Sequence, residues 1–419
     1  MAASYSFASY APTGSFRWSS DPFRGDDSEF GTGGRLAHVN IVEATKSYEN
    51  WMRRCTQVVE SDLRYKHQQM RKDPFLFFRS TFYRWVQLWP ELCRDLCRAP
   101  KVLAVGDLHV GSFGTWRDSE GRMCWGVDDF DESYPLPYTN DLVRLAVSVK
   151  LSVDAESLTI KFKQGCDVVL EAYRETLRAE GRPFVLAEAQ QTLEKLGIEA
   201  IKPPEDFWPK LNQRPVVTHG LPSSARRAIE KTLPERNLPY KVVRREAGHG
   251  SLGQQRFVAI SNWCGAFIAR EAKATIPSSC VWLNGTVDHC QTYYETAIKN
   301  AVRSHDPYQK MVGSWLIRRL SPDANPIEVE DLPKQRDEMI LLQAMGAETA
   351  NVHLGTKRQR KKILSDLQRR KSNWLRNAAK DMAKATGKNI VVTSRTQALA
   401  LFWKILEPLR QPPRKIRAS

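Results

Sequence analysis

The stretch VGDLHVGSFG, residues 105–114, is the most informative part of this 419-residue chain. It continues the short apolar run Val102–Val105, which predicts a strand and places Asp107 at the end of that strand. Twenty-two residues later, Asp129 lies in a second acidic segment, DDFDE, residues 128–132. Carboxylates clustered in this way repel one another unless a cation lies between them, so we expect Mg²⁺ or Mn²⁺ with oxygen ligands. The candidate ligands are Asp128, Asp129 and Asp131. Acidic turns and helix caps are the alternative interpretation.

Two chemistries use a Gly-Asp-x-His start such as the one at residues 106–109. The metallophosphoesterase fold opens with it, but then needs a second Gly-Asp motif and an Asn-His pair, and the chain has neither further along. In kinase-like phosphotransferases, one aspartate takes the proton of the acceptor hydroxyl and a later one holds Mg²⁺ against the phosphates. Asp107 and Asp129 match these two roles in order. The candidate catalytic residues are Asp107, His109 and Ser112.

A glycine-rich run, GHGSLG, occupies residues 248–253. The segments RFVAI and AFIAREAKA that follow it predict two strands, so the context is strand, loop, strand, which disfavours a Rossmann site. A glycine flap over phosphates, with a basic residue on the next strand, is the kinase arrangement. Arg270 and Lys273 point to opposite faces of a strand; we favour Lys273, with Glu295 on a following helix as its partner. The candidate nucleotide-binding residues are Gly248, Gly250, Ser251, Gly253, Arg270, Lys273 and Glu295. A hairpin with solvated charges is the alternative.

The order of these parts is unusual for a kinase. The glycine loop and the lysine conventionally precede the catalytic aspartate, whereas here they follow it by more than 140 residues. Residues 314–320 nevertheless match a strand joining two lobes, and residues 341–354, with His353 at the end, match the helix that leads into the catalytic loop. A circular permutation explains this order: the conventional ends are joined through residues 202–240, and the new termini open near the catalytic loop.

The series GDLH, GTWRD, DDFDE and TNDLVRLAVS, followed by GHGSLG and REAKA, resembles a largely bacterial family, domain of unknown function 2252, over about residues 70–355. That family is grouped with the kinase-like folds, so the resemblance implies ATP and Mg²⁺, but it supplies no substrate. It implies that Asp107 is the catalytic aspartate and Asp129 the metal aspartate. It also implies structural support from Asp141, which braces the catalytic loop, and from Arg144 one turn on.

Two positions depart from the family pattern. The family usually has asparagine where this chain has Ser112 and Asp128. The position of Ser112 is the one expected to hold a second metal, and a serine hydroxyl is a shorter and weaker ligand than an amide oxygen. A nucleotide-binding protein without transfer activity is therefore an open alternative.

Positive charge is concentrated at the C-terminus. The chain has 63 Lys plus Arg and 47 Asp plus Glu, a net charge of +16, and residues 356–419 hold 18 of the basic residues and three of the acidic ones. The densest runs lie within 357–362 and 369–371. We expect either a surface for an anionic partner or a solvated helix face. No nucleic-acid motif accompanies these runs.

Strand-like segments set between helical ones predict a mixed α+β protein, a two-lobed, protein-kinase-like fold that is circularly permuted and has helical N- and C-terminal extensions. Residues 140–182 and 185–197 have helical patterns, and residues 118–121 predict a hairpin turn. A buried helical stripe is predicted at Phe78, Phe82, Trp85, Trp89, Leu92 and Leu96. The expected divisions are a loose arm (1–40), a helical lobe with the catalytic and metal loops (41–201), a connector (202–240), a β-rich nucleotide-binding lobe (241–315), an inter-lobe strand and return helix (316–355), and a basic helical tail (356–419).

Composition excludes several classes of protein. No apolar run is long enough to cross a membrane, and the N-terminus lacks the pattern of a secretory signal. Eight cysteines without a CxxC motif argue against a disulfide scaffold or zinc ribbon and indicate a reducing cytoplasm. We therefore expect an ATP- and Mg²⁺-dependent phosphotransferase whose acceptor the sequence does not name. The alternatives are a nucleotide-binding pseudokinase or nucleotidyl transferase with an anion-binding tail, and, with less support, a metallophosphoesterase.

Overall fold

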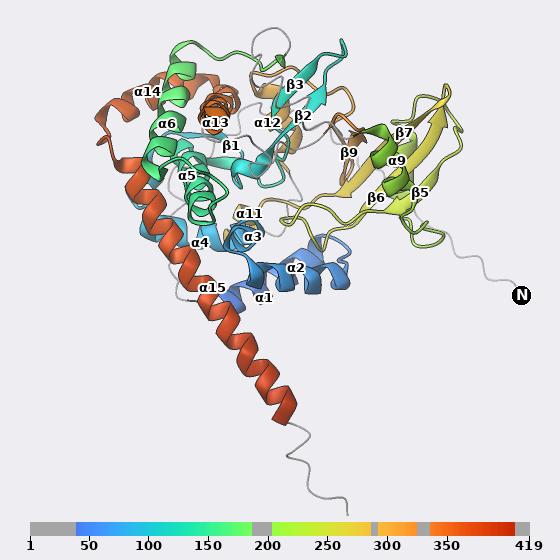
Figure 1. The fold of residues 1–419 in the computed structure, drawn as a ribbon, viewed down its shortest axis with the longest axis horizontal. Coiled ribbons are helices and arrows are strands. Elements are labelled where there is room, and N and C mark those ends of the chain that lie inside the picture. The colour runs from blue at the N-terminus through green and yellow to red at the C-terminus, as the bar shows by residue number, and fades with distance from the viewer. Residues whose placement is uncertain (1–38, 187–202, 286–291, 325–335, 407–419) are drawn as a thin grey trace, which may run out of the picture.

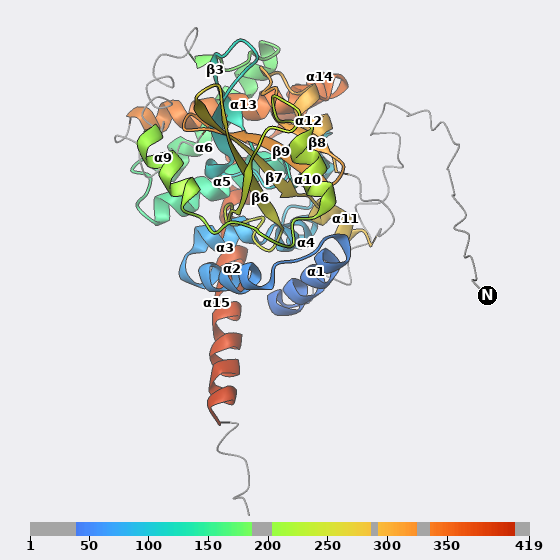
Figure 2. The ribbon, with the colours of Figure 1, turned by 90° about the vertical axis from the view of Figure 1, so that its right-hand side faces the viewer.

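The computed structural model describes residues 39–186, 203–285, 292–324 and 336–406. Residues 1–38 of the predicted arm and most of the predicted helix at 185–197 lie outside the described residues. The described part is a mixed α+β protein with small sheets. Figures 1 and 2 show one large sheet beside a mainly helical part, with the N-terminal helices packed below both. None of its helices combines the length and apolarity needed to cross a membrane.

Four short helices open the described chain: α1 (Ile41–Cys55), α2 (Glu60–Lys72), α3 (Pro74–Ser80) and α4 (Phe82–Leu92). Asn40 caps α1 by accepting from two backbone N–H groups, and Asp73 caps α3, which begins with a proline. The predicted stripe is buried except at Leu92. Leu92 is the last residue of α4 and its side chain is exposed, so that part of the prediction was wrong. A short 3₁₀ turn, η3 (Leu96–Arg98), follows.

Two small antiparallel ladders carry the loops of interest. Their strands are β1 (Lys101–Ala104) with β4 (Tyr134–Pro137), and β2 (Phe113–Arg117) with β3 (Met123–Val127). The β2–β3 pair is the predicted hairpin, and its turn is stabilised by Asp118, which accepts from the backbone N–H groups of Glu120 and Arg122. The loop after β1 contains η4 (Val110–Ser112), and the loop after β3 contains the acidic segment.

The helical part is built around α5 (Tyr138–Asp154), in which residues 138–149 are all buried. Around it pack α6 (Phe162–Arg178), α13 (Arg336–Leu354) and α15 (Trp374–Leu406); η6 (Lys357–Gln359) and α14 (Arg360–Arg369) link the last two. The predicted single helix at 140–182 is thus two helices. The break follows α5, where Glu156 has φ +59° and the carbonyl of Ser152 accepts from two later N–H groups.

The large sheet is fully antiparallel, with the order β5-β6-β7-β9-β8. Its strands are β5 (Lys241–Arg244), β6 (Arg256–Trp263), β7 (Ala266–Ala274), β8 (Lys310–Val312) and β9 (Trp315–Leu320), with α11 (Ser279–Leu283) and α12 (Tyr294–Asn300) between β7 and β8. The predicted connector is not unstructured: it contains α9 (Pro204–Asn212) and α10 (Ser223–Glu230). Helix α10 covers one face of the sheet, because Ala225, Ala228 and Ile229 recur on one side of the helix and pack on it.

The other face of the sheet divides in two. Near α9 it is apolar, with Val258, Ile260 and Ala269 packed on Leu211. Strand alternation puts every second residue on this same face. At its other end that alternation yields charged side chains that face the acidic segment: Arg256, Glu271, Lys273 and Arg318. This polar end of the sheet positions the site.

Candidate functional site

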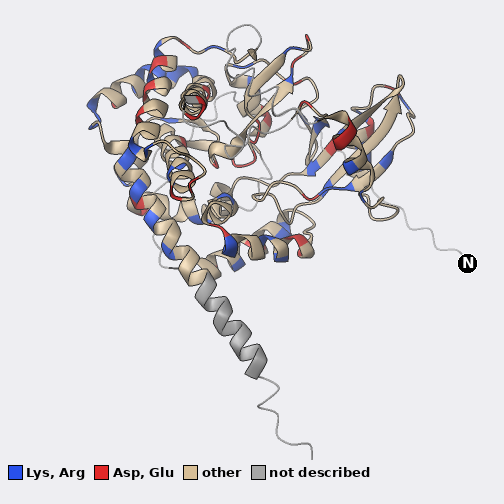
Figure 3. Cartoon of the chain, viewed as in Figure 1, with Lys and Arg blue, Asp and Glu red and all other residues tan. Residues whose placement is uncertain are grey.

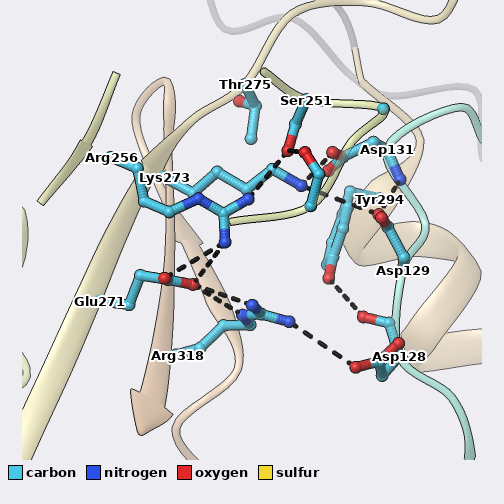
Figure 4. Close-up of polar contacts among 12 residues, drawn as sticks. Asp128, Asp129, Asp131, Ser251, Arg256, Glu271, Lys273, Thr275, Tyr294 and Arg318 are labelled. Carbon is cyan, nitrogen blue, oxygen red and sulfur yellow. Dashed lines mark hydrogen bonds and ion pairs between the residues drawn. The ribbon is translucent and has the colours of Figure 1, made fainter. Parts of the chain in front are cut away.

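Predicted site residues from distant parts of the chain meet at one cavity. It has about 40 Å³ of free space and is bordered by the loops after β1 and β3, the glycine-rich loop between β5 and β6, and helices α1–α4. Its lining includes four carboxylates, two basic side chains and two residues of the glycine-rich loop: Asp107, Asp129, Asp131, Glu132, Lys66, Arg79, Gly250 and Ser251. Figure 4 shows how the acidic loop and the sheet face each other there.

The Asp141 carboxylate on α5 holds the loop after β1. It accepts hydrogen bonds from the backbone N–H groups of Val105 (2.7 Å) and Gly106 (3.0 Å), and it lies 3.0 Å from His353 Nε2 of α13. Gly106 has φ +85°, and a Cβ there would lie 2.2 Å from a backbone carbonyl oxygen, so only glycine fits. The chain turns at this glycine and brings the next residue, Asp107, to the cavity. Asp141 therefore lies where the sequence predicted a brace.

Asp107 is paired with the buried Arg144, one turn further along α5. Arg144 Nε donates to Asp107 Oδ1 at 2.7 Å. Its guanidinium carbon lies 4.0 Å from the ring centre of Phe78 and also over the rings of Phe82 and Trp85. Burial raises the pKa of Asp107 to about 6, and Arg144 opposes this effect. A carboxyl group with a pKa near working pH is suited to general base catalysis.

His109 and Ser112 do not line the cavity, which corrects their prediction as catalytic residues. His109 Nδ1 accepts from the N–H of Gly111 at 3.1 Å, and the N–H of His109 donates to Ser112 Oγ at 3.1 Å. Ser112 Oγ in turn donates to the carbonyl of Asp107 at 3.3 Å. Both buried side chains thus form the reciprocal cap of η4 and shape the loop that carries Asp107.

Each aspartate of the acidic loop faces a cation of the protein. Asp131 is bonded to Lys273 Nζ, and Asp129 Oδ1 lies 3.8 Å from the same atom. Asp128 lies 3.9 Å from Arg318, and burial raises its pKa to about 6. The Asp129 side chain is 54% exposed and accepts from the backbone N–H of Asp131 at 3.2 Å. Asp129 is therefore the carboxylate of this loop with most access to an incoming ligand.

The predicted ligand set for a metal needs revision. Within the described ranges, no three His, Cys, Asp or Glu side chains are grouped so that they could hold a metal ion. Asp128 turns towards Arg318 and is not part of the cavity lining. Mg²⁺, however, commonly takes only one or two carboxylates and completes its shell with water and substrate phosphates. Asp129 and Asp107 both line the cavity, and Asp131 Oδ1 is buried without a hydrogen-bond partner. The residues fit a Mg²⁺ site in which Asp129 is the protein ligand and water and substrate phosphates complete the shell.

The glycine-rich loop closes over Asp107 and is fastened at several points. Lys66 Nζ on α2 donates to the carbonyl of Gly250 at 2.8 Å, and Arg256 donates to Ser251 Oγ at 2.8 Å. A Cβ on Gly250 would lie 3.8 Å from Asp107 Oδ2, so the loop approaches the carboxylate closely. The predicted arrangement of strand, glycine loop and strand is present, with β5 before the loop and β6 after it.

The two basic candidates on β7 point in opposite directions, as strand geometry predicts. Lys273 is buried and faces the acidic loop. Arg270 lies on the other face, where it donates to the carbonyl of Thr232 and lies 4.2 Å from the ring centre of Tyr308. Glu295 is exposed on α12 and forms no ion pair with Lys273, whose acidic partners are those of the loop after β3. The predicted Lys273–Glu295 pair is therefore wrong.

A buried charge cluster beside Lys273 was not predicted from the sequence. Glu271 is fully buried and contacts Arg245 (2.6 Å), Arg256 (3.2 Å) and Arg318 (2.8 Å), as Figure 4 shows for the last two. Burial raises the pKa of Glu271, but Arg256, Arg245 and Arg318 outweigh it and hold this pKa well below its usual range. A signal was available, because Glu271 lies two residues before Lys273 and so shares its face.

Lys66 and Arg79 were also missed. They come from α2 and α3, and nothing in their local sequence distinguishes them from other basic residues of helices. Only the packing of the N-terminal helices against the glycine-rich loop brings them to the cavity.

Comparison with known proteins identifies one family. Residues 41–205 match the model of a family described as an uncharacterized protein conserved in bacteria, domain of unknown function 2252. The matched segment contains Asp107, Asp129 and Asp141 and ends before the glycine-rich loop. No curated protein and no solved structure matches the chain. Residues 41–205 are thus similar to the domain of unknown function 2252 family.

Proposed function

We propose that this protein is an ATP- and Mg²⁺-dependent phosphotransferase of the kinase-like superfamily. One observation carries the proposal. Asp107, Asp129 and the glycine-rich loop, which is more than 140 residues from Asp107 in sequence, line a single cavity, and Lys273 contacts its acidic wall. An aspartate base, a metal aspartate, a glycine flap and a strand lysine are the parts that phosphoryl transfer requires.

The connectivity of the elements supports a two-lobed, circularly permuted kinase-like fold. The glycine loop joins β5 to β6, the lysine lies on the next strand, β7, and β9 precedes α13 in the chain, as an inter-lobe strand precedes the return helix. Just after α13, Thr356 Oγ1 accepts from the N–H of Leu103 in β1 at 2.9 Å. The end of α13 is therefore adjacent to the strand that leads into the loop of Asp107, which is the junction that a permutation would have cut.

In the proposed reaction, the acceptor hydroxyl oxygen forms a bond to the γ-phosphorus of ATP. The bond from that phosphorus to the β,γ-bridging oxygen breaks, ADP leaves, and the hydroxyl proton passes to Asp107. Arg144 orients Asp107, and Lys273 is placed to bind the phosphates on leaving its aspartate partners. Mg²⁺ bound at Asp129 would supply charge neutralisation for the phosphates. Catalysis would then consist mainly of positioning and electrostatic stabilisation.

Nucleotide binding requires the glycine-rich loop to move. The 40 Å³ cavity is large enough for a few water molecules at most and far too small for a nucleotide. The Lys66–Gly250 and Arg256–Ser251 hydrogen bonds hold the loop in the closed position, so we expect them to break or rearrange when ATP enters.

Thermal unfolding with Mg²⁺ and ATP tests the nucleotide site directly. A ligand at about 100 times its Kd stabilises the folded state by roughly 2.7 kcal/mol, so Mg-ATP should raise the unfolding temperature. Asp129→Ala should abolish the Mg²⁺-dependent part of this shift while leaving the unliganded protein folded, because the side chain is half exposed. The control is Glu120→Ala, which removes an exposed carboxylate from the β2–β3 turn. An unchanged shift in Asp129→Ala would contradict the assignment.

A nucleotide-binding pseudoenzyme is the second candidate, and Ser112 favours it. The Ser112 hydroxyl is engaged by its own loop through His109 and Asp107 and does not reach the cavity. The residues then offer one Mg²⁺ site and no second one at this position. Ser112→Asn should distinguish the two: a gain of transfer activity from an undetectable level would show that the wild type had lost a metal ligand. The mass added to a modified acceptor would separate phosphoryl from nucleotidyl transfer.

A further inference from the structure

The N-terminal helices supply a cationic wall to the cavity. Lys66 from α2 and Arg79 from α3 both line it, together with Asp107. Both also act electrostatically on Asp107: Arg79 lowers its pKa, and Asp107 in turn favours the charged form of Lys66. Lys66 and Arg79 lie on helices, whereas Lys273 lies on a strand of the large sheet and pairs with the acidic loop.

Within the described part of the chain, neither cation pairs with a carboxylate. Lys66 is 6% exposed, donates to the carbonyl of Gly250 and forms no ion pair with a described residue. Burial lowers its pKa, against the influence of Glu49, Asp107 and Glu132. Arg79 also forms no ion pair with a described residue, and its Nε is buried without a hydrogen-bond partner. A buried ammonium without a counter-ion and a guanidinium whose buried Nε has no acceptor are both unfavourable, so the placement of Lys66 and the half-buried Arg79 beside Asp107 requires an explanation.

A third nitrogen group adjoins them. His249, in the glycine-rich loop, has a buried Nδ1 without a hydrogen-bond partner. Burial lowers the pKa of His249, and the charges of Arg79 and Lys66 lower it further. This influence of Arg79 and Lys66 on His249 is consistent with positive potential at this wall, where Lys66 and Arg79 themselves line the cavity and which an anion would neutralise.

We infer that Lys66 and Arg79 form a binding subsite for the phosphate or carboxylate group of a small acceptor molecule, whose hydroxyl is thereby placed at Asp107. This inference rests on the proposed function, since it names the acceptor class of the same site. We take the acceptor to be a small molecule because the free space at this wall is only about 40 Å³. The backbone hydrogen bond from Val59 to Gly253 (2.8 Å), unlike the Lys66–Gly250 bond, is not expected to break when ATP enters and keeps the end of the loop against α2.

Inorganic phosphate is the probe, titrated calorimetrically into the full chain without nucleotide. Wild type should bind it, and Arg79→Met should weaken binding about tenfold or more, because charge-assisted hydrogen bonds are the strong class. Lys66→Met should do the same. The matched control is Arg64→Met, which removes a charge from an exposed position of α2 and should bind as wild type does. Circular dichroism and urea unfolding would establish that each variant is folded. Arg79→Met is the decisive variant, since Arg79 makes no ion pair with a described residue that its loss would break.

The Lys273→Met variant separates this subsite from the nucleotide site. It should retain phosphate binding and lose the Mg-ATP thermal shift. Two results would overturn the inference: phosphate binding that is lost in Lys273→Met but unchanged in Arg79→Met, or no phosphate binding to the wild type. In either case, an intact Mg-ATP shift of the wild type would leave the proposed function standing. Conversely, Arg79-dependent phosphate binding without any nucleotide binding would refute the phosphotransferase, and with it the acceptor role of the subsite.

Discussion

At the scale of single residues, the site depends on buried, charged side chains of α5. Asp141 accepts two backbone hydrogen bonds and contacts His353, and Arg144 is enclosed by aromatic rings while it bonds to Asp107. Buried charges of this kind are tolerated only when they are fully partnered. The loop of Asp107 is therefore fixed by the same helix that forms the centre of the core.

Asp141→Ala should lower the free energy of unfolding by about 3 kcal/mol or more, because it removes one partner from a buried charged network. Two backbone N–H groups and His353 would be left without their acceptor. Urea denaturation measures the change, and Asp154→Ala, an exposed carboxylate at the end of the same helix, is the control. A surface change of that kind typically alters stability by less than about 0.5 kcal/mol. Equal stabilities of the two variants would refute the bracing role.

The pKa of Asp107 predicts the acid limb of the pH profile. If Asp107 is the base, turnover requires its ionised form, so kcat/KM should fall as the pH drops below about 6, the value to which burial raises this pKa. Arg144 opposes that rise, so Arg144→Gln should move the limb to higher pH, whereas Arg144→Lys should leave it closer to that of the wild type. A flat profile between pH 5 and 8 would exclude this base.

At the scale of elements, alternation along the strands explains both the predicted and the missed residues. Period two correctly separated Lys273 from Arg270, and the same rule places Glu271 beside Lys273. The Gly–Asp–x–His motif correctly marked the loop of Asp107. It gave no indication that His109 and Ser112 cap that loop from within, because the direction of a side chain in a 3₁₀ turn depends on the local backbone.

The glycine-rich loop supplies a prediction about packing. Gly253 has φ +101°, and a Cβ there would lie 2.5 Å from Leu63 Cδ2 on α2. Gly253→Ala should therefore lower the urea midpoint more than Gly265→Ala, since Gly265 also has a positive φ (+81°) but faces open space. Both variants share the backbone strain, and the additional clash with Leu63 in Gly253→Ala should cost about 1–3 kcal/mol more, as overpacking of a core does. Equal losses would contradict the contact with α2.

This contact also determines which glycine variant reports on function. Gly250→Ala meets its nearest neighbour at 3.2 Å, so the variant should fold, and a weakened Mg-ATP shift in it would support the nucleotide role. A metallophosphoesterase would not use this loop for nucleotide, and there Gly250→Ala should have no effect. Gly253→Ala cannot make this distinction, because it disturbs α2 whatever the chemistry.

At the scale of the whole molecule, sequence reasoning succeeded where a motif carried the information and failed where only packing did. Asp107, Asp129 and the glycine-rich loop were each recognisable and lie together. Lys66 and Arg79 were not, because their role follows from how α2 and α3 pack against a loop nearly two hundred residues away. The predicted pairing of Glu295 with Lys273 was wrong for the same reason. A helix was expected to face Lys273, and the acidic loop faces it instead.

The basic tail is part of the same core as the rest of the chain. Figure 3 shows Lys and Arg on α14 and along the described part of α15, among many uncharged residues. Arg360 donates to the carbonyl groups of Leu177 and Arg178 at the end of α6, and Arg370 to Tyr138 and Asp366. The opposite side of α15 is apolar and buried against the core, through Leu375, Ala378, Ala379, Met382 and Ala383. Among the described basic residues of the tail, those available to an anionic partner are exposed ones such as Lys361, Lys362, Arg369, Lys380, Lys384 and Lys388.

This division predicts opposite outcomes for neighbouring residues of α15. Met382 is 1% exposed, so Met382→Ala should lower the free energy of unfolding by about 2–5 kcal/mol, the usual cost of emptying a buried site of this size. Lys384→Gln, two residues on and exposed, should leave stability within about 0.5 kcal/mol of the wild type. Urea unfolding of the full chain measures both. Helix α15 packs directly on α5, the helix that holds Asp141 and Arg144. A single cooperative transition of Met382→Ala at lower urea would therefore show that the tail and the loop of Asp107 unfold together. A small loss of stability in Met382→Ala would instead mean that α15 is a separable appendage whose removal leaves the site intact.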